Sequence, residues 1–102
     1  MTGNLSLEKR KKDIDPEHIK IIEEMIGDAS KEICDNDPEI YRLKNTKVSI
    51  KDEVTVDLYL IIKFGTNIPE SAWDIQKNLK GRIKEITELE VKRINIHIDG
   101  VR

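Results

Sequence analysis

The sequence predicts an α/β (α+β) two-layer sandwich, in which both helices cover one face of a three-stranded mixed sheet. Apolar residues occupy every second position from Val54 to Phe64, as in a strand that buries one face. Two further segments repeat apolar residues at spacings of three and four, as in a helix that buries one side. A second alternating segment closes the sequence, so the predicted element order is α-β-β-α-β.

Length and composition fit one small folded domain. The chain has 102 residues, and charged and hydrophobic residues each make up 37% of it. We predict a flexible polar and basic tail over residues 1–13 and a single domain over residues 14–102. The lone Cys34 cannot form an internal disulfide, which is typical of a reducing cytoplasm. No apolar run approaches the roughly 20 residues that cross a bilayer, and the first residues lack the apolar core of a signal peptide.

The first helix is predicted to begin at Asp15 and Pro16, because Asp favours the N-cap and Pro the first helical position. One apolar stripe follows it, consisting of Ile19, Ile22, Ile26, Ala29 and Ile33. The segment "DNDP" at 35–38 ends the helix, since a residue before proline resists helical geometry.

Residues 47–64 are predicted to form an antiparallel hairpin that reverses at Asp52-Glu53. Its second strand spans about 11 residues, and its core face carries Val54, Val56, Leu58, Leu60, Ile62 and Phe64. Its other face carries Thr55, Asp57, Tyr59, Ile61 and Lys63.

The second helix is predicted to open at Pro69, with Trp73 beside its apolar stripe. That stripe consists of Ile68, Ala72, Ile75, Leu79, Ile83 and Ile86. The helix is long enough to return the last strand, residues 90–99, parallel to its predecessor. Two helices with one apolar side each can cover only one sheet face, so the other face is predicted to be bare.

His97 lies between Ile96 and Ile98, which belong to the core-facing set, so its side chain is predicted to point to the bare face. It could be a solvated strand position, part of a partner-binding surface, or a catalytic base. No nucleophile motif accompanies it or His18, no ligand spacing favours zinc, and the glycines form no phosphate loop. The sequence therefore predicts no catalytic residue, no metal site and no cofactor.

The bare face is the best candidate for an interaction surface. It combines an aromatic and a branched aliphatic residue with polar neighbours, as protein–protein contact patches do. An ordinary half-solvated sheet face is the alternative. The candidate residues are Thr55, Asp57, Tyr59, Ile61, Lys63, Arg93, Asn95 and His97.

A basic cluster in the tail consists of Lys9, Arg10, Lys11 and Lys12. It either keeps the chain soluble or attracts an anionic membrane weakly, at about 1 kcal/mol per cation. A small nucleic-acid-binding domain is the alternative function, but the net charge of −2, the few aromatics and the absence of a G-x-x-G loop do not favour it.

Several motifs resemble the alkaline-shock protein family of bacterial general-stress proteins. They are "DLYLII" at 57–62, G-x-x-I-P-E at 65–70, A-W-D-I-Q-x-N-L at 72–79, E-I-T-x-L-E-V at 85–91 and I-N-I-H-I-x-G-V at 94–101. Asn95 and His97 match the polar positions of the family's closing segment. Two features depart from the family: Glu88 stands where glycine is common, at a position suited to left-handed geometry, and "DNDPEIYRLKNT" lacks a glycine-rich turn.

The resemblance implies a non-enzymatic, cytoplasmic stress-response protein of cell-envelope homeostasis, which acts through protein–protein interaction. It also implies self-association into a homo-oligomer and recruitment to the membrane by a separate membrane-anchor protein.

Overall fold

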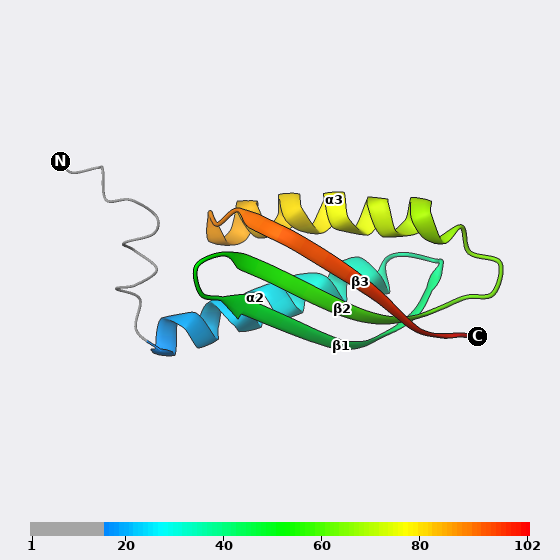
Figure 1. Ribbon diagram of the computed structural model, residues 1–102, viewed down its shortest axis with the longest axis horizontal. Helices are drawn as coiled ribbons and strands as arrows, with labels where there is room; N and C mark the ends of the chain where they lie inside the picture. The colour runs from blue at the N-terminus through cyan, green and yellow to red at the C-terminus, as the bar shows by residue number, and fades with distance from the viewer. Residues whose placement is uncertain (1–15) are drawn as a thin grey trace.

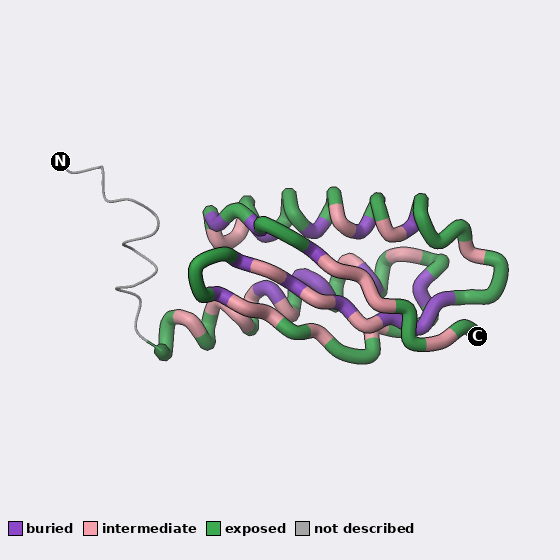
Figure 2. The backbone as a smooth tube through the Cα atoms, in the orientation of Figure 1, coloured by how far each residue is buried: buried purple, intermediate pink, exposed green. Residues whose placement is uncertain are grey.

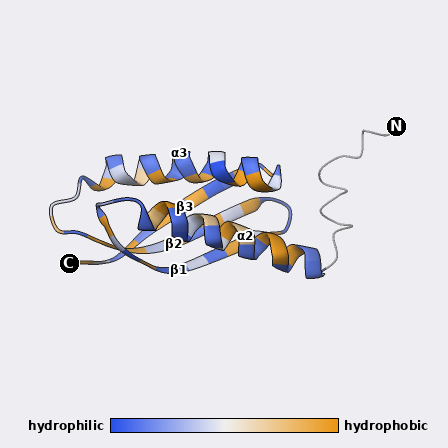
Figure 3. Cartoon of the chain, turned by 180° about the vertical axis from the view of Figure 1, so that it is seen from behind, coloured by the Kyte–Doolittle hydropathy of each residue, from blue (hydrophilic) through white to orange (hydrophobic). Residues whose placement is uncertain are grey.

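The computed structural model describes residues 16–102, which form two helices and a three-stranded sheet. The elements are α2 (Pro16–Asp35), β1 (Ile40–Ile50), β2 (Val54–Ile62), α3 (Ile68–Thr87) and β3 (Val91–Val101). The strand order is β1-β2-β3, with β2 antiparallel to β1 and parallel to β3. Figure 1 looks onto the sheet with α2 behind it, and Figure 3 shows both helices from the back. This arrangement confirms the predicted fold class; the tail and the Asp15 cap lie outside the described residues.

The hydrophobic core lies between the sheet and the two helices, with β2 at its centre. Figure 2 shows buried positions alternating along β2 and recurring on one side of each helix. Fully buried side chains come from both layers: Ile26, Val54, Val56, Leu58, Leu60, Ile75, Leu79 and Ile83. Each such aliphatic side chain stabilises the fold by about 1.5–3 kcal/mol relative to exposure, so β2 is fixed firmly between its neighbours.

Capping interactions define the ends of α3. The Asn67 side chain accepts a hydrogen bond from the Glu70 amide at 3.2 Å, and Pro69 follows as predicted. At the other end Glu88 adopts φ 62° and ψ 11°, and its amide donates to the Lys84 carbonyl at 2.9 Å. The position suited to glycine is therefore left-handed here too, although a glutamate occupies it.

The prediction that Phe64 belongs to the core is wrong, because this side chain is 88% exposed. β2 ends at Ile62, and Gly65 turns the chain with φ 88°. The strict alternation also fails just before this end, where Ile61 and Ile62 are both buried.

β1 begins at Ile40, seven residues before the predicted strand. Register shifts fall between Ile40 and Arg42 and between Leu43 and Asn45, so Tyr41 and Lys44 are extra residues opposite β2. The turn before β1 needs no glycine, since the Asp37 carboxylate accepts a hydrogen bond from the Glu39 amide at 2.9 Å.

The prediction that Ile68 belongs to the core is wrong, because this residue at the start of α3 is 41% exposed. Ile94 is buried and Ile96 partly buried, whereas Ile98 near the end of β3 is 37% exposed. Trp73 does not cover the edge of the helix stripe: it is 59% exposed, and the Lys77 ammonium lies 4.7 Å from its ring centroid.

Candidate functional site

The open face of the sheet, opposite the helices, brings several of the sequence-predicted residues together. In the parallel pairing of β2 with β3, Asp57 lies opposite Asn95 and Tyr59 lies opposite His97. Because side chains alternate along a strand, these four residues share the face that carries no helix. They form one connected group across the two strands.

Asp57 is the hydrogen-bonding centre of this group. Its Oδ1 accepts from Asn95 Nδ2 at 3.1 Å and lies 3.0 Å from His97 Nε2. The pKa of Asp57 is lowered below its usual 3.8, mainly because His97 donates a hydrogen bond to the carboxylate. The hydrogen bond from Asn95 and the charges of His97 and Lys47 also lower this pKa, whereas desolvation of the carboxylate raises it. An ionised carboxylate cannot donate, so His97 Nε2 carries the shared proton.

The Tyr59 and His97 rings stack face to face, with centroids 4.4 Å apart and planes 9° from parallel. The Lys47 ammonium on β1 lies 5.4 Å from the Tyr59 centroid, on the side of β2 away from β3. The His97 ring from β3 and the Lys47 ammonium from β1 therefore occupy the two faces of the Tyr59 ring. Lys47, Tyr59 and His97 form an ordered ridge, called here the aromatic ridge, that crosses the three strands.

A second contact spans the open face nearer the ends of β2 and β3. Lys44 and Asp99 lie on the two outer strands, and their ion pair of 3.4 Å must pass over β2. Both residues are extra residues at register shifts, which explains how strands on opposite sides of β2 bring these side chains together.

The other candidate residues take different roles on this face. Thr55 lies opposite Arg93 and is partly buried, and Arg93 is exposed. Lys63 is exposed too, but it follows the end of β2 at Ile62, so the pairing of the strands does not place it on the open face. Ile61 is only 8% exposed and packs near Gly100, where an added Cβ would lie 3.7 Å from Ile61 Cγ1. Ile61 therefore supports the face and offers little surface to a partner. The basic cluster Lys9–Lys12 lies outside the described residues.

Sequence patterns missed the contribution of β1 to this face. Register places Arg42, Asn45, Lys47 and Ser49 beside the open-face residues of β2. The two extra residues in β1 break the period of two, so no alternation signals the first half of this strand.

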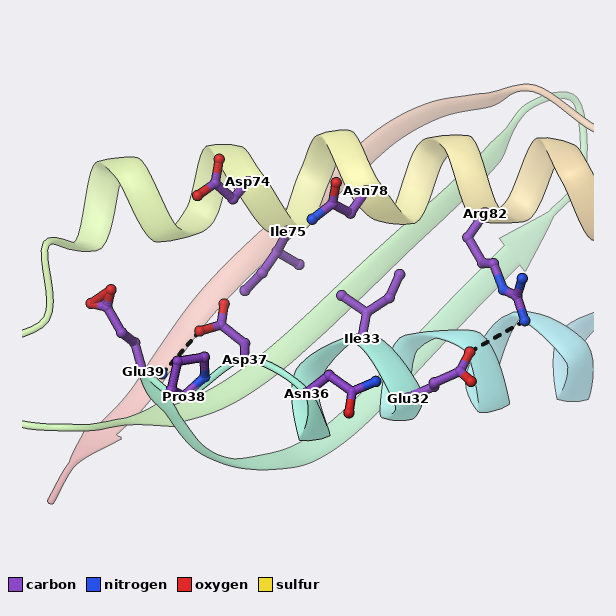
Figure 4. Close-up of a pocket in the computed structure, with 10 residues that line it drawn as sticks. All are labelled: Glu32, Ile33, Asn36, Asp37, Pro38, Glu39, Asp74, Ile75, Asn78 and Arg82. Carbon is purple, nitrogen blue, oxygen red and sulfur yellow. Dashed lines mark hydrogen bonds and ion pairs between the residues drawn. The ribbon is translucent and has the colours of Figure 1, made fainter.

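A cleft lies on the helix side of the molecule, between α3, the end of α2 and the following turn (Figure 4). It has a volume of about 640 Å³, and its charged lining consists of Glu32, Asp37, Glu39, Asp74 and Arg82. Arg82 is held by Glu32 at 3.3 Å and by Glu85 at 3.0 Å. No cysteine, serine or histidine lines this cleft, so its described residues supply no nucleophile with an adjacent base.

Cys34 is not available for chemistry. It is 1% exposed, and burial, assisted by Asp37 and Asp35, raises the pKa of its thiol to about 12. Cys34 therefore acts as a small buried residue of the core. Within residues 16–102, no group of three or more His, Cys, Asp or Glu side chains could hold a metal ion.

The sequence comparisons identify the family. The profile of the alkaline-shock protein 23 family, described as having a cell envelope-related function, matches residues 43–102. The chain belongs to this family. It is 30% identical over 82 residues to the uncharacterized protein YqhY of Bacillus subtilis (strain 168), covering 79% of this chain and 61% of YqhY. It is also 32% identical over 84 residues to the uncharacterized protein YloU of the same organism, covering 76% of this chain and 70% of YloU.

Among solved structures, the fold is similar to variants of the MamM CTD. One gives a TM-score of 0.53 with 9% identity, covering 82% of this chain and 96% of that chain. Another gives 0.51 with 9% identity, covering 76% and 93%. At such identity the likeness concerns the fold alone.

Neither of the two described helices has the length and apolar character that a bilayer crossing requires.

Proposed function

We propose that this protein serves a cell-envelope-related function by binding other proteins through the open face of its sheet, without catalysing a reaction. The aromatic ridge is the observation that carries this proposal. Tyr59 is stacked by His97 and Lys47, and the Asp57 hydrogen bond fixes His97 in turn. Because these side chains are ordered before binding, they lose less conformational entropy on association, and tyrosine is a frequent source of binding energy.

The finer parts of the proposal follow from the family resemblance. The partners would be further copies of this chain and a membrane-anchor protein, which would hold a cytoplasmic protein near the envelope. The exposed cations of the face, Arg42, Lys47 and Arg93, would set which partners fit.

Nucleic-acid binding is the alternative function. The basic residues of the open face favour it, since they could contact phosphates. The aromatic ridge opposes it, because single-stranded nucleic acids stack their bases on exposed ring faces and both faces of Tyr59 are occupied.

The test replaces Tyr59 and measures the size of the complexes that contain this protein in a lysate of its native cell. Gel filtration should show wild-type protein in complexes larger than the monomer and the Tyr59→Ala variant as monomer. Trp73→Ala is the matched control, since Trp73 is an exposed aromatic on α3. Unchanged elution of Tyr59→Ala would contradict the proposal, and elution changed by nuclease alone would favour the alternative.

A further inference from the structure

The open face is more basic than the rest of the molecule. It carries the cations Arg42, Lys44, Lys47 and Arg93, and the carboxylates Asp57 and Asp99. Both carboxylates are paired, Asp57 with His97 and Asp99 with Lys44. Arg42, Lys47 and Arg93 form no ion pair with any residue in 16–102. This surface therefore attracts carboxylates, although the whole chain has a net charge of −2.

The excess of cations argues against a symmetric dimer that joins two open faces. In such a dimer the unpaired Arg42, Lys47 and Arg93 of one copy would approach the same cations of the other. Like charges brought together at an interface cost several kcal/mol. The surface that fits must be acidic and must offer an apolar contact for Tyr59.

The outward side of α2 has these two properties. Glu17, Ile21, Glu24 and Asp28 recur at spacings of four, three and four, so they share one side of the helix. All four are exposed, and Ile21 is 53% exposed although it is a large apolar residue. Glu24 and Asp28 form no ion pair with another described residue. The buried residues Ile26 and Ala29 occupy the opposite side.

We propose that the open sheet face of one copy docks on the outward side of α2 of a second copy, with Tyr59 against Ile21 and the basic residues against Glu24 and Asp28. This inference rests on the proposed function, because it uses the same sheet face. The lengths agree: a helix of 20 residues spans about 30 Å and a strand of 11 residues about 36 Å.

The two surfaces lie on opposite layers of the molecule, as Figures 1 and 3 show. The contact is therefore heterologous, and each docked copy still presents one free sheet face or one free α2 surface. Further copies can add until a ring closes or an open chain grows.

The test reverses charge on each surface of the purified chain and measures association by sedimentation velocity in low salt. The sheet variant is Lys47→Glu with Arg93→Glu, and the helix variant is Glu24→Lys with Asp28→Lys. Each should weaken self-association by more than about tenfold, because like charges then meet across the contact. Lys80→Glu with Lys84→Glu on α3 changes the net charge as much as the sheet variant does, and should associate like wild type.

The decisive variant combines both reversals in one chain, where the contact again joins opposite charges. Association should return toward wild type, which only a direct contact explains. All substituted residues are exposed, so the substitutions should not disturb the core. If circular dichroism shows that a charge-reversal variant is misfolded, a variant with alanine at the same positions replaces it.

The possible failures are distinguishable. If the sheet variant loses association while the helix variant keeps it, or if the combined chain stays dissociated, this inference is overturned and the proposed function stands. A wild-type chain that remains monomeric would also overturn it. If the sheet variant associates normally while wild type self-associates, the open face itself is not the contact, and the proposed function loses its support as well.

Discussion

Asp57 connects the two strands on which the open face depends. Its carboxylate accepts from Asn95 and His97 of β3, and this contact orients the ring that stacks on Tyr59. The carboxylate of Asp57 on β2 thus fixes the positions of Asn95 and His97 on β3. Removal of the Asp57 carboxylate should make the aromatic ridge less ordered without unfolding the core, since the side chains of Asp57 and His97 are partly exposed.

The low pKa of Asp57 gives a direct prediction at this scale. His97→Ala removes the main cause of the lowered pKa, so the pKa of Asp57 should rise toward 3.8. Carbon NMR of the carboxyl group through a pH titration measures it. Arg93→Ala is the control, because Arg93 makes no hydrogen bond to Asp57; equal titration midpoints in wild type and His97→Ala would contradict the assigned cause.

The same shift makes stability depend on pH. A folded-state pKa below the unfolded value stabilises the fold above pH 3.8, and this contribution is lost as pH falls through the lower, folded value. The difference in unfolding free energy between wild type and Asp57→Asn should therefore disappear in acid. We expect it to stay under about 1 kcal/mol at neutral pH, since the pair is solvent-screened.

At this scale the sequence predicts which residues share a face, but not what they contact. Period-two alternation is enough to place Asp57, Tyr59, Asn95 and His97 opposite the core. The stacking and the hydrogen bonds depend on the register of β2 against β3, which pairs Asp57 with Asn95 and Tyr59 with His97. No local pattern in either strand contains that information.

Among the helices and strands, backbone strain is found at the C-terminal end of α3, at Glu88. Glu88 is left-handed, a conformation that costs a residue with a Cβ about 1–2 kcal/mol. Glu88→Gly should raise the unfolding free energy by about 0.5–1 kcal/mol, because glycine removes that cost but gains freedom in the unfolded chain. Urea denaturation measures the change. Glu90→Gly, two residues later and exposed, should not stabilise; equal effects at both positions would contradict the explanation.

The strands show where sequence periodicity fails as a guide. The inward residues of β1 are Ile40, Leu43, Thr46, Val48 and Ile50, at spacings of three, three, two and two. An extra residue at a register shift turns the following side chains to the other face, so the first half of β1 matches neither a strand nor a helix pattern. The second half alternates and was predicted correctly.

On the scale of the whole molecule, the layer arrangement determines which surfaces are free. Both helices cover one side of the sheet, and the other side stays open (Figure 1). A two-layer order was predictable from the amphipathic stripes, since each helix has one apolar side. The charge contrast between the open face and α2 was not predictable from the sequence. It depends on β1 residues such as Arg42 and Lys47, which the period-two pattern did not assign to this face.

Photo-crosslinking in the native cell tests most directly whether the open face binds proteins. A photoreactive amino acid replaces Asn45, which is exposed and lies opposite Tyr59, or Lys80, which is exposed on α3. We predict protein adducts from position 45 that disappear when Tyr59→Ala is added, and few from position 80. Equal adducts at both positions, or adducts from 45 that persist without the Tyr59 ring, would contradict the account.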